Sequence, residues 1–143
     1  MHSVERSVLL PYSAAQMFDL VADVSSYPDF MPWCGGASVN ENSESGMVAS
    51  VTIALGSIKQ TFTTRNTHQY PEHIHLALID GPFSALTGHW HFVPLGDEAC
   101  KVVFNLQYEF SSRTLGALVG PIFNRIASSF IDSFTKRAEE KYA

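Results

Sequence analysis

Cysteine is scarce in this chain of 143 residues, which contains only two. Cys34 and Cys100 lie far apart and form no C-x-x-C pair. A disulfide framework, a cysteine-based zinc site or a dithiol redox motif therefore does not fit the sequence. We expect two reduced thiols, as in a cytoplasmic protein.

Charge is also scarce, above all positive charge. Charged residues make up 16% of the chain, and 9 Lys and Arg against 14 Asp and Glu leave a net charge of −5. Because nucleic-acid binders normally present a basic face, this balance argues against sequence-independent binding, and we predict no DNA partner. The hydrophobic content of 45% excludes a disordered chain.

Long apolar runs, repeats and linkers are absent as well. No run of 18 apolar residues occurs, and the first residues lack the apolar region and cleavage motif of a secretory signal. Since the length is typical of one unit, we expect a single domain over residues 1–143. We predict a cytoplasmic location, with a peripheral position at the inner face of the membrane as the alternative.

What the sequence does contain is a series of alternating apolar segments followed by an apolar helical stripe. Strands are predicted over residues 3–10, 48–55, 58–68, 73–80, 88–95 and 101–110. Ser13 and Gln16 have the spacing of a capping box, which predicts a short helix over residues 14–22. Apolar residues spaced three and four apart from Leu115 to Phe134 predict a long C-terminal helix, whose length we take over residues 121–142. Pro121 lies near its start, either in the first turn or at a kink.

The dimensions of these elements predict a cavity. The C-terminal helix would be about 33 Å long, and a ten-residue strand is about 34 Å long, so the helix can lie along a sheet. A sheet of about six to seven strands is roughly three times as wide as the helix. The sheet must therefore curl around the helix, which gives an α+β fold with a tunnel lined by its inward faces.

Three segments of the chain resemble one known family. They are SAAQMFDLVADVSSYPDFMPWC (residues 13–34), DGPFSALTGHWHF (residues 80–92) and FIDSFTKRAEEKY (residues 130–142). Together they resemble the coenzyme Q-binding START-like family, which has the helix-grip fold and includes the ribosome association toxin and oligoketide cyclase-like proteins of bacteria. The resemblance implies that a ubiquinone-like isoprenoid quinone or related lipid binds in the tunnel and that the chain supports respiratory quinone function without an established catalytic step. From the residues themselves we predict no catalytic residue, metal or cofactor.

Aromatic and aliphatic side chains are the candidates for contact with such a ligand. The family motifs place some at the tunnel and its mouth, namely Phe30, Trp33, Phe83, Leu86, Trp90 and Phe92. The inward faces of the predicted strands and helix add Phe62, Leu76, Phe104, Leu106, Tyr108, Phe123, Ile126 and Phe130.

Two other functions stay open. Binding of the large ribosomal subunit, which would block subunit joining as in the toxin members, would need a basic patch. Candidates on the C-terminal helix are Arg113, Arg125, Lys136, Arg137 and Lys141. The net charge of −5 favours quinone binding over this role.

A cyclase-like enzyme, the other open function, would need a polar pair inside the tunnel. Asp80, Arg65 and Tyr108 are the nearest candidates. Turn capping for Asp80 and a surface position for Arg65 are simpler interpretations.

The histidines at 73, 75, 89 and 91 form two H-x-H pairs on strands expected to be neighbours. Depending on register the pairs would face one another, and imidazole suits zinc or copper. Because their partners Ile74, Leu76 and Trp90 are apolar, we place the histidines on the wet outer face. No cysteine or carboxylate completes a site, so we predict no metal.

The turn over residues 27–33 has two interpretations. Phe30, Met31 and Trp33 either touch the membrane interface, where tryptophan is favoured, to collect or deliver a quinone, or they close the end of the tunnel as core residues.

Overall fold

Alternation of apolar and polar side chains along the chain produces one antiparallel sheet. The computed structural model describes residues 1–142, so Ala143, the last residue of the expected domain, lies outside the described part. The strands are β1 (His2–Leu10), β2 (Cys34–Ser43), β3 (Gly46–Leu55), β4 (Ile58–Gln69), β5 (His73–Asp80), β6 (Phe83–Pro94) and β7 (Cys100–Phe110). They follow the order β1-β7-β6-β5-β4-β3-β2.

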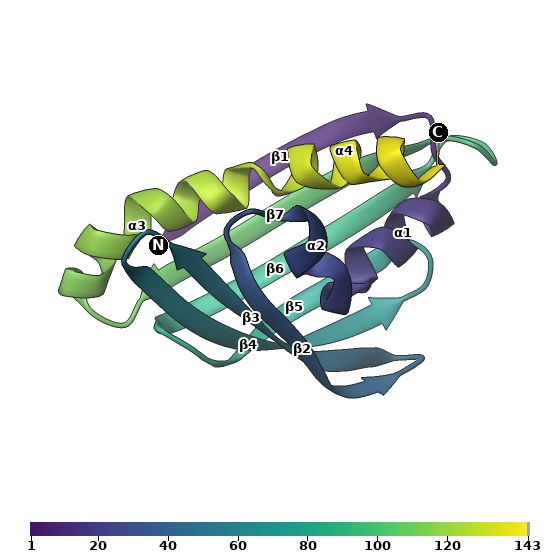
Figure 1. The fold of residues 1–143 in the computed structure, drawn as a ribbon. Helices are drawn as coiled ribbons and strands as arrows, with labels where there is room; N and C mark the ends of the chain where they lie inside the picture. The colour runs from purple at the N-terminus through teal and green to yellow at the C-terminus, as the bar shows by residue number, and fades with distance from the viewer. Residues whose placement is uncertain (143) are drawn as a thin grey trace.

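Helices cover one face of this sheet. Between β1 and β2 lie α1 (Ala14–Ala22), the 3₁₀ turn η1 (Val24–Ser26) and α2 (Tyr27–Phe30). After β7 follow α3 (Arg113–Ser128) and α4 (Phe130–Tyr142). Figure 1 shows the sheet curling beneath α3 and α4, with α1 and α2 on the same side. The predicted α+β architecture of a curled sheet around a long C-terminal helix is confirmed.

Local sequence signals explain the early elements. The Ser13 hydroxyl accepts the Gln16 N–H at 3.1 Å, and the Ser13 N–H donates to Gln16 Oε1 at 2.9 Å. This confirms the capping box and the start of α1. At the turn between β3 and β4, Gly56 adopts a φ of 62°, a left-handed conformation that favours glycine.

Two strands differ from the prediction. β2 was not expected, because it is an edge strand that pairs only with β3 and is too exposed to show an apolar alternation. β6 begins at Phe83 rather than at residue 88. A bulge between Phe83 and Ala85 interrupts the period of two on which the prediction relied.

The C-terminal helix begins at Arg113, close to Leu115, where the predicted apolar stripe starts. Ser112 caps α3 by accepting the Leu115 N–H at 3.1 Å, and Pro121 lies inside α3, which excludes the first of the two positions considered for it. The helix is interrupted at Ser129, whose hydroxyl donates to the Ile126 carbonyl at 2.7 Å. Such a bond to the preceding turn commonly bends a helix.

The combined stretch Arg113–Tyr142 is long and apolar enough to cross a membrane by length and composition. In the structure its stripe of Val119, Phe123, Ile126 and Phe134 is buried in the core. Only 28% of its most apolar window is buried, however, and Leu118 is 66% exposed, so packing against the sheet accounts for part of its hydropathy. The two cysteines are free thiols, and burial raises the pKa of each.

Candidate functional site

A cavity of about 70 Å³ lies between the curled sheet and the helices. Its sheet wall comes from β3, β4, β5 and β6, and its helical wall from the α1–α2 region and α4. Trp33, Phe62, Leu76, Trp90 and Phe130 line it, and all five belong to the predicted ligand residues. The cavity is therefore a mainly apolar compartment inside the predicted tunnel region.

The remaining predicted residues do not reach this cavity. Most are buried core residues, namely Phe83, Leu86, Phe92, Phe104, Leu106, Tyr108, Phe123 and Ile126. Under α3, for example, the Phe123 ring centroid lies 4.7 Å from that of Tyr108 and 5.1 Å from that of Phe83. Close packing of these rings fills that end of the interior.

The turn before β2 belongs mostly to the core. Met31 and Trp33 are 1% and 6% exposed, and the Trp33 ring lies 5.5 Å from the Phe130 ring. Phe30 is half-buried, packs on Phe134 and carries the Arg137 guanidinium 5.0 Å above its ring. Of the two interpretations of this turn, the structure supports core packing for Met31 and Trp33.

A row of polar side chains on β4 lines the cavity and was missed in the sequence. Thr64, Asn66 and His68 share the inward face of the strand with Phe62. The Thr64 hydroxyl donates to Asn66 Oδ1 at 2.6 Å. Counting every second residue from Phe62 would have placed these three side chains on the inward face. They were missed because polar residues on a strand are ordinarily assigned to the solvent face.

Two buried nitrogens beside the cavity lack a partner. Trp33 Nε1 and His68 Nε2 are inaccessible to solvent and have no hydrogen bond to any group in residues 1–142. Leaving such a group unsatisfied costs about 1–3 kcal/mol. Unpaired buried polar atoms in a native fold call for an explanation, and a ligand acceptor would provide one.

The ionisable groups around the cavity are held neutral. Burial lowers the pKa of His68 below its ordinary value of 6.5. Burial, with a smaller effect of the Asp23 carboxylate, raises the pKa of Tyr27, whose hydroxyl donates to the Val21 carbonyl. The cavity therefore offers hydrogen bonds without formal charge at neutral pH.

Acidification below about pH 6.5 is expected to destabilise the fold through His68. Because its pKa is lower in the folded chain, the unfolded chain binds more protons in this range. The stabilising contribution is complete above pH 6.5 and is lost as the pH falls through the folded-state pKa. His68→Leu should reduce the drop in Tm between about pH 7.5 and 5.5, measured by thermal unfolding. An undiminished drop would contradict this role.

The candidate acid–base residues do not meet in the cavity. Asp80 is exposed and accepts the Gly81 N–H at 3.0 Å, and exposed Arg65 lies 3.7 Å from Glu41. The Tyr108 hydroxyl donates to Asn124 Oδ1 at 3.3 Å, and burial raises its pKa. The simpler structural roles considered for Asp80 and Arg65 match their positions.

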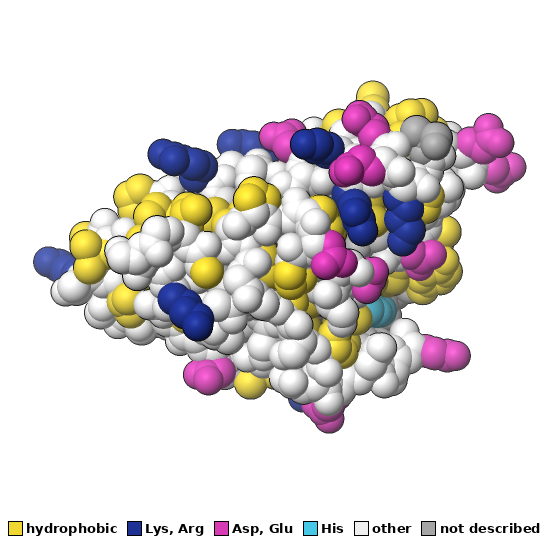
Figure 2. Space-filling view, in the orientation of Figure 1, with side chains coloured by type: hydrophobic (Ala, Val, Ile, Leu, Met, Phe, Trp, Pro, Cys, Tyr) yellow, Lys and Arg dark blue, Asp and Glu magenta, His cyan; other side chains and the backbone are white. Residues whose placement is uncertain are grey.

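The basic candidates do not form a patch of one sign on α4. Lys136 and Arg137 share a surface hollow with Asp132 and Glu140. Figure 2 likewise shows side chains of both signs near the C-terminal end of the long helix. On α3, by contrast, Arg113 and Arg125 are exposed and no acidic residue is present.

An antiparallel sheet curled around a C-terminal helix, with an apolar cavity between them, is the helix-grip architecture of START-like proteins. The chain belongs to the family described as polyketide cyclase / dehydrase and lipid transport, which matches residues 10–135.

Two relatives show the range within this family. The chain is 46% identical over 142 residues to the ribosome association toxin RatA of Vibrio cholerae, covering 99% of each protein. It is 25% identical over 140 residues to the coenzyme Q-binding protein COQ10 homolog B, mitochondrial, of Xenopus laevis, covering 95% of this chain and 57% of that protein.

Solved structures share the fold at low identity. The Zhui aromatase/cyclase from Streptomyces sp. R1128 gives a TM-score of 0.84 at 16% identity, covering 99% of this chain and 96% of that one. A START superfamily protein from Mycobacterium smegmatis gives 0.75 at 20% identity, covering 99% and 97%. The fold class and the family resemblance seen in the sequence are both confirmed.

Proposed function

We propose that this chain binds the head group of a ubiquinone-like isoprenoid quinone, or a related lipid, in the internal cavity. It would act in the cytoplasm as a carrier that supports respiratory quinone function, and not as an enzyme. The observation that carries the proposal is the pair of unpartnered nitrogens, Trp33 Nε1 and His68 Nε2, in an otherwise apolar compartment. The name of the Xenopus relative supports the same ligand class.

The chemistry of the two nitrogens matches a quinone. Quinone carbonyl oxygens are hydrogen-bond acceptors without charge. The Trp33 indole is a donor only, and the neutral His68 ring donates when its proton is on Nε2. Two donors and an apolar wall would orient the head group, while burial of apolar tail surface contributes about 25 cal/mol per Å².

The size of the cavity implies that a ligand must open it. About 70 Å³ is well below the roughly 300–1,000 Å³ of ligand pockets. The sheet wall is held by pairing between neighbouring strands, whereas η1 and α2 comprise three and four residues. We therefore expect η1 and α2 to move outward when the ligand enters.

Titration with ubiquinone-1, a quinone with one isoprene unit, tests the proposal. Trp33 and Trp90 are the two tryptophans of the chain and both line the cavity, so their fluorescence reports on its occupancy. We expect saturable quenching, and about tenfold weaker binding for His68→Leu because one hydrogen bond worth about 1–1.5 kcal/mol is lost. Solvent extraction with mass spectrometry should detect quinone in native preparations.

Matched measurements separate binding from collisional quenching. His2→Leu, a substitution at an exposed histidine outside the cavity, should bind as the unchanged chain does. N-acetyltryptophanamide gives the non-specific quenching curve. A linear curve matching this compound, together with a quinone-free extract, would overturn the proposal.

A second candidate function is association with the large ribosomal subunit. It is favoured by the 46% identity to the Vibrio toxin over nearly the whole length of both chains. The exposed face of α3, with Arg113 and Arg125, is the surface best suited to RNA because no acidic residue interrupts it. Such a surface would act without the cavity, so substitutions inside the cavity separate the two functions.

Cyclase chemistry gains no such support, since Asp80 and Tyr108 do not line the cavity.

A further inference from the structure

The pairing of β5 with β6 brings the two H-x-H motifs face to face. His73 lies opposite His91, and His75 lies opposite His89. Between them Ile74 lies opposite Trp90, and both of these side chains are buried and line the cavity. Because side chains alternate along a strand, the histidines project from the other face of the sheet.

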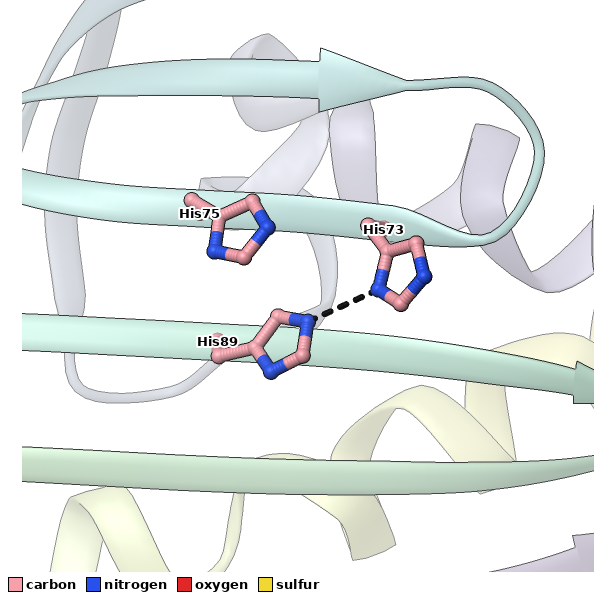
Figure 3. Close-up of side chains that lie close together, drawn as sticks. All are labelled: His73, His75 and His89. Atoms are coloured by element: carbon pink, nitrogen blue, oxygen red, sulfur yellow. Dashed lines mark hydrogen bonds between the residues drawn. The ribbon is translucent and has the colours of Figure 1, made fainter.

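The imidazole rings form one compact cluster. The ring centroids of His75 and His89 lie 4.3 Å apart, and those of His73 and His91 lie 4.2 Å apart. His73 Nδ1 is 2.9 Å from His89 Nε2, the hydrogen bond drawn in Figure 3. One nitrogen from each of His73, His75 and His89 lies within 4.8 Å of the other two.

These spacings are close to those of a metal centre. Zinc–imidazole bonds of about 2.0–2.1 Å in a tetrahedral site place ligand nitrogens roughly 3.3 Å apart. His73 and His89 already bring two nitrogens nearer than that, and modest rotation of the exposed His75 side chain would bring in a third. A metal would replace the hydrogen bond, and the donor ring would carry its proton on the other nitrogen.

The surroundings of the cluster suit neutral nitrogen ligands. On the β4 side, Thr67 lies opposite His75 and Gln69 lies opposite His73. On the β7 side, Asn105 lies opposite His89. None of these flanking residues carries a charge that would repel a cation. β5 and β6 are inner strands of the sheet, which gives the ligands a firm scaffold.

In place of the sequence-based prediction of no metal, we propose that His73, His75 and His89 form a surface site for a divalent transition-metal ion of the zinc, copper or nickel class. Imidazole favours these ions, whereas calcium and magnesium require oxygen ligands. Three protein ligands leave a coordination position for water, and His91 lies next to the site. The site is on the opposite side of β5 and β6 from the cavity and does not depend on quinone binding.

Isothermal titration of the untagged full chain with zinc chloride, and separately with copper or nickel chloride, tests the site. We expect one ion per chain for at least one of these metals and no binding of magnesium or calcium. His75→Ala/His89→Ala should bind at least tenfold more weakly. His2→Ala provides the control, because this exposed histidine lies outside the cluster and should leave the affinity unchanged.

Thermal unfolding gives a second readout. The bound ion should raise the Tm of the unchanged chain and not that of the double variant, since only the folded state presents the cluster. The proposal would be overturned if the double variant bound metal as tightly as the unchanged chain, or if His2→Ala lost as much affinity as the double variant. It would also be overturned if none of the three metals bound one to one. If the double variant does not fold in the presence of EDTA, His75→Ala replaces it, because His75 is exposed.

Discussion

Replacing Phe104 with alanine is expected to lower the free energy of unfolding by about 3–5 kcal/mol. Phe104 is 0% exposed in β7, and its ring centroid lies 4.3 Å from Trp90 and 5.6 Å from Phe130. The substitution removes ring contacts with two residues that also line the cavity, and the neighbouring strands cannot move inward to compensate. Urea unfolding followed by far-UV circular dichroism measures the loss.

Val103→Ala is the matched control for this substitution. Val103 precedes Phe104 on the same strand but is half-buried on the outer face. We expect it to cost less than about 1 kcal/mol. Equal losses for the two variants would mean that β7 does not divide into a buried and an outer face as the structure shows.

Replacing Ala49 with leucine is expected to abolish binding of ubiquinone-1. Ala49 lies on β3, is 3% exposed and lines the cavity. The added carbon atoms would occupy much of the roughly 70 Å³ cavity, which the head group must enter and widen. Because new apolar contacts offset the cost of repacking, the free energy of unfolding should stay within about 2 kcal/mol of the original.

Ala77→Leu provides the comparison for the cavity. Ala77 is exposed on β5 and lies outside the cavity, so the same side-chain change should leave quinone binding intact. Unchanged binding by Ala49→Leu would contradict the cavity as the site.

Co-sedimentation with large ribosomal subunits at physiological salt extends the Ala49→Leu experiment. Association through the surface of α3 should survive the substitution, whereas loss of both activities would show that they share the cavity.

Signals local in the sequence predicted much of this fold. The Ser13–Gln16 capping box and the alternation along residues 101–110 are such signals, because each depends on neighbours a few positions away. β2 escaped prediction because an exposed edge strand needs no apolar face. The sequence left Pro121 either in the first turn of the C-terminal helix or at a kink, and only the structure places it within α3.

The candidate site was predicted only in part. Trp33, Trp90 and Phe130 do line the cavity, but Phe92 and Phe104 fill the core instead. Strand alternation tells which face a side chain occupies, and it does not tell where along that face space remains. The packing of large rings from distant segments decides this.

The sequence by itself determined most of the elements, most of their apolar faces and the family to which the chain belongs, because periodicity and motif are properties of neighbouring residues. Only the tertiary structure placed Thr64, Asn66 and His68 inside the cavity, buried Trp33 with an unpartnered nitrogen, and set the histidines of β5 against those of β6. These features depend on strand register, curvature and helix packing, which arise from contacts between residues far apart in the chain.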